Sequence, residues 1–350
     1  MPDRRLRVMQ SFGVPRSTTN PYITMLDEAL AAEPSIDHLR FSWGAALRGR
    51  YDVFHWHWPE GKLHGSTWWK STGKFVLTAL LSVRHRLSRR IAVVRTVHNI
   101  ALPEVNAARR RLLVSIDRQT AFRIIINATT PLSAGQRGTL IPHGHYRDWY
   151  APQRHQPRIA GRLGTFGGIR RYKSVDVLLQ AYAQASLEER TLSLRIGGKP
   201  TTPAIADDVR RRAGALRNVE LTLAFLSDAE LVELATQSEL VVLAYRFMHN
   251  SGSVLAALSL GRPVLVPRNV ANETLAAEVG DEWVLMYDGE LDGRTLVEAW
   301  RAASALPSDA MPDLSRREWA DAGAAHAAAY REASDIVDAR ARRYRRRRTP

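Results

Sequence analysis

Short apolar runs alternate with longer amphipathic stretches along nearly the whole chain. The runs are rich in β-branched residues, for example at residues 91–97, 122–126 and 240–244. The stretches between them repeat apolar residues at helical spacing, as Ile23, Leu26 and Leu30 do. Runs of this length are typical of buried parallel strands, and the 3.6-residue period is typical of the helices that cover them. The pattern predicts an α/β fold with parallel sheets and helices on both faces.

A polar segment at residues 143–158 interrupts this alternation and reads as a linker. A chain of 350 residues is long enough for two domains that each bury a core. We therefore expect two Rossmann-like, doubly wound domains that face a central cleft. The expected segments are an N-terminal domain at residues 1–150, a C-terminal domain at residues 159–314, a C-terminal helix at residues 315–338 and a basic tail at residues 339–350.

A polar loop follows the apolar run at residues 240–244 and precedes a run that ends at Gly261. Strand, loop and helix in this order place the loop at a helix N-terminus, where free N–H groups and the helix dipole favour phosphate. The alternative is an ordinary βα turn with a polar cap. The candidate phosphate-binding residues of this loop are Tyr245, Arg246, His249, Asn250, Ser251 and Gly252.

Three other loops combine glycine with a strand end. Arg170 and Lys173 follow the glycine pair at residues 167–168, and either a phosphate site or a basic turn explains them. Gly197, Gly198 and Gly13 end further predicted strands, where a ligand can approach the backbone. The chain has no G-x-G-x-x-G and no D-x-D motif, so neither a dinucleotide fingerprint nor a metal-clamped diphosphate is predicted. Cationic side chains and the helix N-terminus at Ser251 would neutralise a diphosphate instead.

Two of the three candidate acid–base residues lie at the end of the predicted strand at residues 51–57 or directly after it. Strand alternation puts His55 and His57 on one face, and no third metal ligand is suggested nearby. Glu60 follows the strand end and is our first candidate for a general base, with His57 and Asp148 as alternatives. A structural carboxylate at residue 60 is the competing interpretation.

Phosphate-binding features thus fall in the second half of the chain, and acid–base candidates fall in the first. This division is typical of a transferase with a nucleotide donor on residues 159–314 and an acceptor on residues 1–150. We include His98, which follows the strand at residues 91–97, among the donor-binding candidates.

The chain is strongly basic, with a net charge of +15 from 50 basic and 35 acidic residues. Much of this charge lies in two segments, one from Lys70 to Arg90 and one from Arg340 to Arg348. The first is either an interfacial helix on an anionic bilayer or a core helix with a basic end; the second is either a solvated tail or an anion-binding one. We favour a membrane surface over nucleic acid, because aromatic RNA-binding signatures and zinc-finger spacings are absent. With no cysteine, no visible signal segment and no membrane-length apolar run, we expect a cytoplasmic protein, peripheral at the inner face of the cell membrane.

Several motifs run in order through residues 5–330. They are TNPY at 19–22, YDV and HWPE at 51–60, VRTxHN at 94–99, INATTP at 126–131, HGHYRDW at 143–149, FGxIRxYK at 166–173, YRxMHNSG at 245–252 and LSL at 258–260. In these motifs the chain resembles the GT-B glycosyltransferases, and most closely the GDP-mannose-dependent β-1,4-mannosyltransferases of xanthan-type exopolysaccharide assembly.

The resemblance implies a GT-B fold, a GDP-mannose donor, no cofactor and no metal. It further implies a polyprenyl-diphosphate-linked oligosaccharide acceptor and an inverted, β-linked product. Retaining GT-B families place two glutamates, with seven residues between them, at the positions where this chain has Met248 and Ala256. This departure counts against the retaining class. The alternatives are a GT-B transferase with a UDP-sugar donor and a non-catalytic protein that binds anionic polymers through its tail.

Overall fold

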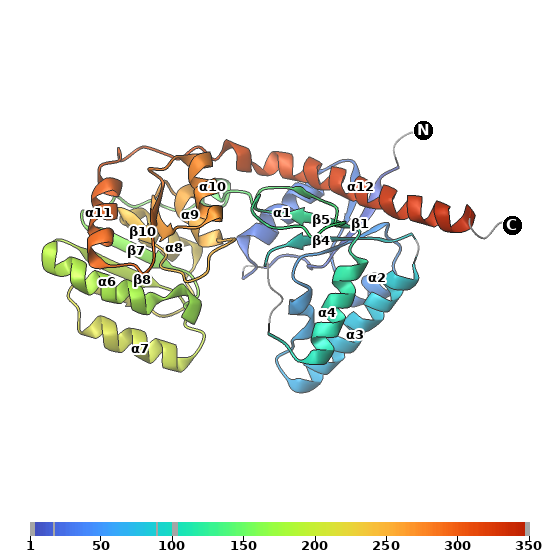
Figure 1. The fold of residues 1–350 in the computed structure, drawn as a ribbon, viewed down its shortest axis with the longest axis horizontal. Coiled ribbons are helices and arrows are strands. Elements are labelled where there is room, and N and C mark those ends of the chain that lie inside the picture. Colours follow the sequence, from blue (N-terminus) through green and yellow to red (C-terminus); the bar gives the residue numbers. More distant parts are fainter. Residues whose placement is uncertain (1–3, 17, 89, 100–103, 347–350) are drawn as a thin grey trace. The chain divides into compact units, whose positions relative to one another are not determined.

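The computed structural model describes residues 4–16, 18–88, 90–99 and 104–346, which form two compact units. Unit 1 comprises residues 1–144 and 317–350, and unit 2 comprises residues 145–316. Figure 1 shows that each unit is a sheet covered by helices. Both sheets have six strands and only parallel pairings, as the alternating pattern predicts.

The sheet of unit 1 has the strand order β2-β1-β3-β4-β5-β6. Its strands are β1 (Leu6–Gln10), β2 (Ile36–Leu39), β3 (Val53–Trp56), β4 (Ala92–Val97), β5 (Phe122–Ile125) and β6 (Gly138–Leu140). Its helices are α1 (Pro21–Ala32), α2 (Trp43–Arg48), the 3-10 helix η1 (Pro59–Leu63), α3 (Trp68–Leu87), α4 (Ala107–Gln119) and α12 (Trp319–Arg346). Met9 pairs with Phe54 across β1 and β3, and both side chains lie in the core.

The loop after β1 leads into a well-capped helix. The Asn20 side chain accepts a hydrogen bond from the Tyr22 backbone N–H, and Pro21 occupies the first turn of α1. Tyr22 itself is buried. This confirms the predicted strand–loop–helix opening and places an aromatic side chain next to the carboxyl ends of the strands.

The C-terminal helix α12 belongs to unit 1, although 172 residues of unit 2 separate it from the rest of that unit. It packs against α1 and lies beside β1, β3, β4 and β5 (Figure 1, red). Tyr330 and Ala333 are fully buried in this contact. The last helix therefore completes a core that the first 144 residues leave open.

The sheet of unit 2 has the strand order β12-β11-β10-β7-β8-β9. Its strands are β7 (Arg162–Phe166), β8 (Ser193–Gly197), β9 (Val219–Thr222), β10 (Leu240–Val242), β11 (Val264–Pro267) and β12 (Val284–Tyr287). Its helices are α5 (Arg147–Tyr150), η2 (Arg171–Lys173), α6 (Val175–Glu188), α7 (Pro203–Gly214), α8 (Asp228–Gln237), α9 (Gly252–Ser259), α10 (Val270–Val279) and α11 (Gly293–Ser304), and η3 (Ser315–Arg317) precedes α12. Leu178, Tyr182 and Leu296 bring α6 and α11 into one core with the sheet.

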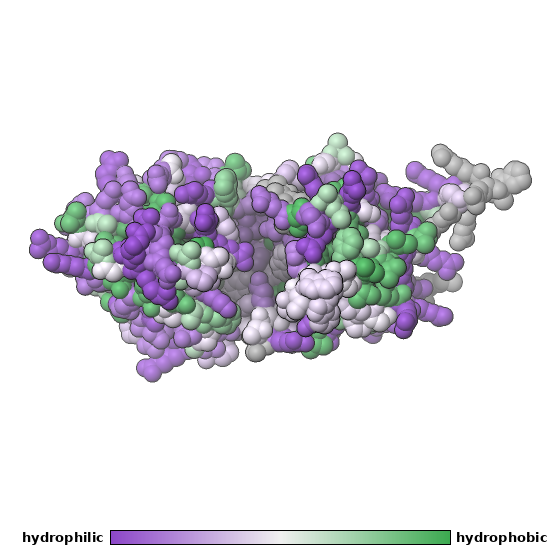
Figure 2. All heavy atoms as spheres, turned by 90° about the horizontal axis from the view of Figure 1, so that it is seen from below, coloured by the Kyte–Doolittle hydropathy of each residue, from purple (hydrophilic) through white to green (hydrophobic). Residues whose placement is uncertain are grey.

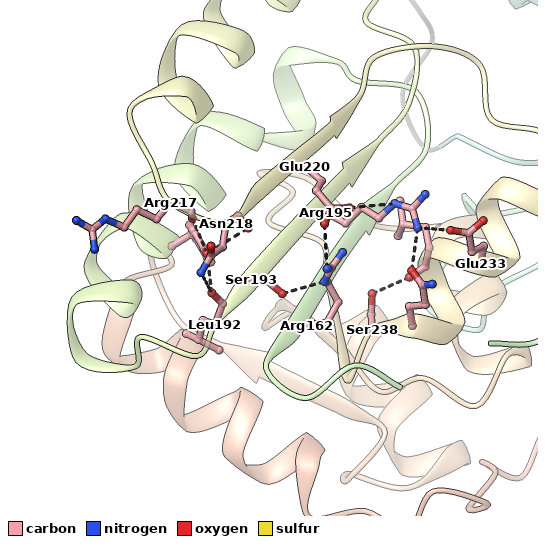
Figure 3. Close-up of polar contacts among 12 residues, drawn as sticks. Arg162, Leu192, Ser193, Arg195, Arg217, Asn218, Glu220, Glu233 and Ser238 are labelled. Atoms are coloured by element: carbon pink, nitrogen blue, oxygen red, sulfur yellow. Dashed lines mark hydrogen bonds and ion pairs between the residues drawn. The ribbon is translucent and has the colours of Figure 1, made fainter. Parts of the chain in front are cut away.

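Ion pairs tie the strands on one side of this sheet together (Figure 3). Arg162 on β7 contacts Glu220 on β9 at 3.0 Å, and Arg195 on β8 contacts Glu233 on α8 at 2.8 Å. The Arg162 Nε also donates to Ser193 Oγ at 2.8 Å. These contacts join β7, β8, β9 and α8 along one side of the sheet.

The domain limits differ from those predicted. Residues 145–150 belong to unit 2, and Arg147–Tyr150 form the helix α5, where the sequence suggested a linker attached to the first domain. The final helix packs on unit 1 and continues to Arg346, eight residues beyond the predicted end at 338. The predicted tail from residue 339 is therefore helical as far as the structure describes it, and residues 347–350 lie outside the described range. The prediction missed this extension because it assigned the run of arginines to a tail on the basis of charge, although arginine is a good helix former.

Candidate active site

The loops after β7 and β10 meet at the switch point of the sheet in unit 2. These two strands are neighbours, and the chain leaves β7 toward β8 on one side and returns to β10 on the other. Open parallel sheets bind ligands at the carboxyl ends of strands at such a point. The predicted phosphate-binding loops at residues 167–173 and 245–252 both begin there.

Lys173 reaches the turn that follows β7. A Cβ atom on Gly167, which has φ +102°, would lie 2.9 Å from Lys173 Nζ and 3.2 Å from Ser253 Oγ. An ammonium group and a hydroxyl group thus lie close to the Gly167 backbone, where a side chain would crowd both. A phosphate bound beside this turn would have both groups nearby as hydrogen-bond donors.

Tyr245 forms the floor under this ammonium group. Lys173 Nζ lies 4.8 Å from the centroid of the Tyr245 ring, and the Tyr245 hydroxyl lies 3.3 Å from Ser253 Oγ. Burial lowers the pKa of Lys173 from its usual value, and nearby Arg170 contributes in the same direction. Because no carboxylate pairs with Lys173 in the described residues, its charge is available to an anionic ligand.

The N-terminus of α9 lies beside Lys173. The Ser251 side chain caps the helix by accepting from the Val254 backbone N–H at 3.4 Å. The Arg246 backbone N–H donates to the Tyr172 carbonyl at 2.8 Å and so joins the two loops. The first N–H groups of α9 have no acceptor within the helix and carry the positive end of its dipole.

The remaining predicted residues of the two loops differ in exposure. Arg170 and Arg246 are exposed, whereas His249 and Asn250 are half-buried. Burial lowers the pKa of His249. A Cβ on Gly252 would approach the Tyr146 hydroxyl at 3.3 Å, so the first residue of α9 tolerates little additional volume.

At the two glycines that end or follow β8, any larger residue would clash with its neighbours. A Cβ on Gly198 would lie 2.0 Å from the Gly167 carbonyl oxygen, and one on Gly197 would lie 2.7 Å from Leu226 and Leu234. Their packing against neighbouring loops explains both residues without a ligand. Gly13, after β1, has an ordinary backbone and room for a Cβ at 3.4 Å from its nearest neighbour.

Two cavities open beside the basic loops. One of about 370 Å³ lies at the carboxyl ends of β10, β11 and β12, between Ser174, Arg246, Tyr287 and Glu290. The other, of about 320 Å³, is lined by Arg170, Arg171, Ile205 and Asp208 among others. Arg246 borders both cavities. The switch point of unit 2 therefore combines cationic side chains with concave surface.

In unit 1, five histidines and several aromatic residues gather at and behind the carboxyl ends of β3 and β4. The ring centroids of His55 and His57 are 4.2 Å apart, which confirms that both face one side of β3. The His98 ring stacks on Trp58 at 3.8 Å, and Tyr22 packs between His98 and His143. The fifth histidine, at position 326, comes from α12 and lies 5.9 Å from the ring at position 55.

These imidazoles are held neutral by burial. Burial lowers the pKa of His55, His57 and His98 well below the usual value and lowers the pKa of His143 and His326 to about 4. Both ring nitrogens of His57 are engaged, Nε2 with Gln10 at 3.2 Å and Nδ1 with His98 at 3.4 Å. A buried imidazole with both nitrogens occupied is better placed to orient a neighbour than to take a proton from substrate.

The two carboxylates proposed as bases lie in different units. Glu60 is half-buried in η1, directly after β3, and its Oε1 accepts a weak hydrogen bond from Asn99 at 3.5 Å. Asp148 is exposed on α5 of unit 2. Of the three candidates, Glu60 alone combines an accessible carboxylate with a place at the carboxyl edge of the sheet in unit 1.

Sequence reasoning missed residues whose role depends on distant partners. Gln10, Thr96 and Tyr330 contact the histidines, and Ser253 lies with Lys173 beside the Gly167 turn. A polar residue at a core position of β1 was the available signal for Gln10. For Tyr330 no local signal exists, because α12 reaches this site only through tertiary packing. No group of three or more His, Cys, Asp or Glu side chains in the described ranges is arranged to hold a metal ion.

Comparison with known proteins identifies the family to which this architecture belongs. Residues 160–299 match the family model described as glycosyl transferases group 1. Solved structures with the same fold include Anabaena HepE in complex with UDP (TM-score 0.58, 14% identity, 97% of this chain and 99% of that chain) and the sucrose-phosphate synthase of Thermosynechococcus elongatus (TM-score 0.57, 14% identity, 98% and 99%). A GDP-mannose:glycolipid 4-beta-D-mannosyltransferase from Xanthomonas campestris pv. campestris is 41% identical over 332 residues, which cover 94% of this chain and 93% of that protein. The chain therefore belongs to the GT-B glycosyltransferases, in the same family as the GDP-mannose:glycolipid mannosyltransferase.

Proposed function

We propose that this glycosyltransferase moves mannose from GDP-mannose to a polyprenyl-diphosphate-linked oligosaccharide in exopolysaccharide or cell-envelope glycan assembly. The observation that carries the proposal is the 41% identity to the Xanthomonas mannosyltransferase over 94% of the chain. The matched region covers most of both units, so it supports the proposal for the donor side and for the acceptor side.

In this proposal unit 2 binds the diphosphate of the donor. Lys173, Ser253 and the N-terminus of α9 lie beside the Gly167 turn and supply an ammonium, a hydroxyl and backbone N–H groups. These groups match a diphosphate without a bridging divalent ion. Because charge builds up on the leaving GDP during transfer, the same groups stabilise the transition state more than the ground state.

We propose an inverting displacement with Glu60 as the base. The acceptor hydroxyl oxygen bonds to the anomeric carbon of mannose while the bond from that carbon to the β-phosphate oxygen breaks. Glu60 takes the hydroxyl proton, and the electron pair leaves with GDP. The positions of the retaining-class glutamates hold the buried residues Met248 and Ala256, which supports a single displacement.

We place the acceptor on the membrane side of unit 1, because α3 exposes an apolar stripe. Trp69, Val76, Leu80, Val83 and Leu87 follow helical spacing and are 48–76% exposed, whereas the opposite face of α3 is buried. Figure 2, which views the molecule from below, shows hydrophobic residues gathered on this unit with hydrophilic residues around them. Arg86 of α3 and Arg110, Arg111 and Arg118 of α4 line a hollow of about 650 Å³ between the helices.

An apolar stripe flanked by arginines is typical of a helix that lies in an anionic bilayer interface. One face of α3 is core and the other is exposed, so our proposal uses both interpretations that the sequence left open. Within the described ranges, none of the helices has both the length and the apolar character needed to cross a membrane.

A donor comparison tests the proposal. Purified enzyme is incubated with lipid-linked oligosaccharide and radiolabelled GDP-mannose, UDP-glucose or UDP-glucuronate, each with and without EDTA. We expect labelled glycolipid from GDP-mannose alone, unchanged by EDTA, with a β-anomeric configuration in the product. Product from a UDP-sugar would reassign the donor, loss with EDTA would require a metal, and no product from any donor would favour a binding protein.

A further inference from the structure

Six side chains of unit 1 form a continuous line of hydrogen bonds behind the proposed acceptor site. In order they are Thr96, His55, Tyr330, Gln10, His57 and His98. We propose that Tyr330 and Gln10 are positioning residues that fix His57, and through it His98, in one tautomer and one orientation. This inference rests on the proposed function only for its effect on catalysis.

The line begins at β4 and passes through α12. His55 Nε2 lies 2.8 Å from Thr96 Oγ1, and its Nδ1 lies 2.8 Å from the Tyr330 hydroxyl. Tyr330 is fully buried, as are His55 and Thr96. These short contacts leave no room for water, so each atom depends on its protein partner.

The line continues from α12 to the carboxyl edge of the sheet. Gln10 Nε2 lies 3.1 Å from the Tyr330 oxygen, and Gln10 Oε1 lies 3.2 Å from His57 Nε2. His57 Nδ1 then lies 3.4 Å from His98 Nε2, which is the longest link. The His98 ring also stacks on Trp58, directly before η1 and Glu60.

The amide of Gln10 sets the direction of every proton in the line, because an amide nitrogen only donates and an amide oxygen only accepts. The Tyr330 oxygen therefore accepts from Gln10, and its proton turns toward His55 Nδ1. His55 then carries its own proton on Nε2 and donates it to Thr96.

On the other side of the amide, His57 Nε2 must carry a proton that it donates to Gln10 Oε1. A neutral His57 is then bare at Nδ1 and accepts from His98 Nε2–H. All three histidines in the line thus share the Nε2-protonated form. In this proposal Gln10, whose amide is held by Tyr330 of α12, sets the protonation pattern of His57 and His98 at the proposed site.

The test uses full-length protein labelled with ¹⁵N-histidine, since the nitrogen chemical shift distinguishes a protonated ring nitrogen from a bare one. In the unmodified protein we expect His55, His57 and His98 to be protonated at Nε2 alone. In Tyr330→Phe, Gln10 loses its acceptor and its amide is free to turn, so His57 should populate both tautomers. His85, whose Nε2 contacts Tyr51 outside the line, is the internal reference.

Tyr182→Phe is the matched control, because it also removes a buried tyrosine hydroxyl but in unit 2, where the hydroxyl donates to backbone carbonyls. We expect it to leave all histidine signals unchanged. For mannosyl transfer we expect Tyr330→Phe to lower kcat roughly tenfold, with KM for GDP-mannose within about twofold. Tyr182→Phe should leave both constants unchanged.

Gln10→Glu is the second test, and it also serves if Tyr330→Phe does not fold. A carboxylate accepts from both neighbours, so the Tyr330 proton turns toward residue 10, and the His55 proton moves from Nε2 to Nδ1. Wild-type tautomers in either variant, or His57 protonated at Nδ1 in the unmodified protein, would overturn the inference. The spectra decide this even if the enzyme does not use GDP-mannose, so the two proposals fail separately.

Discussion

At the scale of single residues, Lys173 illustrates how burial and charge shape a site. Its ammonium lies over the Tyr245 ring and beside Gly167, and burial lowers its pKa. A bound diphosphate would reverse this shift, because an adjacent anion favours the protonated form. The local structure therefore gains stability when an anion arrives.

We expect Lys173→Met to weaken GDP binding about tenfold to a hundredfold, since one buried charge-assisted contact contributes roughly 1.5–3 kcal/mol. Isothermal titration calorimetry with GDP measures this change. Arg190→Gln, which removes an exposed cation of the same unit, is the control and should bind GDP normally. Equal affinities for Lys173→Met and the unmodified protein would place the diphosphate elsewhere.

Glu60 is the residue on which the proposed chemistry depends. Glu60→Gln keeps the shape of the side chain but removes its basicity, so we expect kcat to fall by about two to four orders of magnitude with donor affinity retained. Steady-state kinetics and GDP calorimetry measure the two effects. Asp148→Asn should keep nearly full activity, and the reverse pattern would make Asp148 the base.

At the scale of elements, α3 shows why an amphipathic pattern needs a structure to interpret it. Thr78, Leu81, Ser82 and His85 pack inward, and the more apolar stripe faces outward. A helix that turns these apolar side chains away from the core presents the kind of surface that the proposed membrane contact requires.

Leu87→Ser tests this interpretation. A leucine that enters a bilayer interface contributes on the order of 1 kcal/mol, so binding to anionic vesicles should weaken about fivefold. Vesicle co-sedimentation measures the change, and high salt should release the unmodified protein. Leu187→Ser is the matched control, because Leu187 is 82% exposed, against 76% for Leu87, but lies in unit 2. Equal weakening in both variants would exclude α3 as the membrane contact.

At the scale of the whole molecule, the two units differ in how they respond to acid. The histidines whose pKa burial lowers to about 4 or further lie in unit 1, and protonating them requires a charge in the core. For His326 the pKa falls to about 4 in the folded chain, below the ordinary value near 6.5 in the unfolded chain. Its folded form is fully stable above pH 6.5 and loses stability as the pH falls toward 4, by about 3 kcal/mol for this one group.

We therefore expect unit 1 to open before unit 2 as the pH falls from 7 to 5. Hydrogen exchange followed by mass spectrometry at both pH values, corrected for the intrinsic exchange rate, measures protection in each unit. The strands β1, β3 and β4 should lose protection while β7 and β10 keep theirs. His326→Gln, which does not titrate, should recover part of the loss. Equal losses in both units would show that carboxylate protonation dominates instead.

Much of this protein could be predicted from local pattern alone. The strands, most helices, the capped start of α1 and the polar loops after β7 and β10 follow from hydrophobic periodicity and capping residues, which act within a few residues of the chain. The phosphate-binding loops could be proposed for the same reason, since a strand, a glycine turn and a helix start are contiguous in sequence.

Only the tertiary structure decided the features that depend on distant burial. One such feature is the return of α12 to unit 1, and another is the exposed side of α3. Lys173 and Ser253 meet at one turn although they are far apart in the chain. The line of hydrogen bonds likewise links β1, β3 and β4 through Tyr330 of α12. Such contacts arise because apolar surface must be covered and buried polar groups must be paired, and no local pattern names the partner. The sequence by itself determined the family and the two parallel sheets, whereas the packing of one late helix determined how the histidines of the first sheet are held.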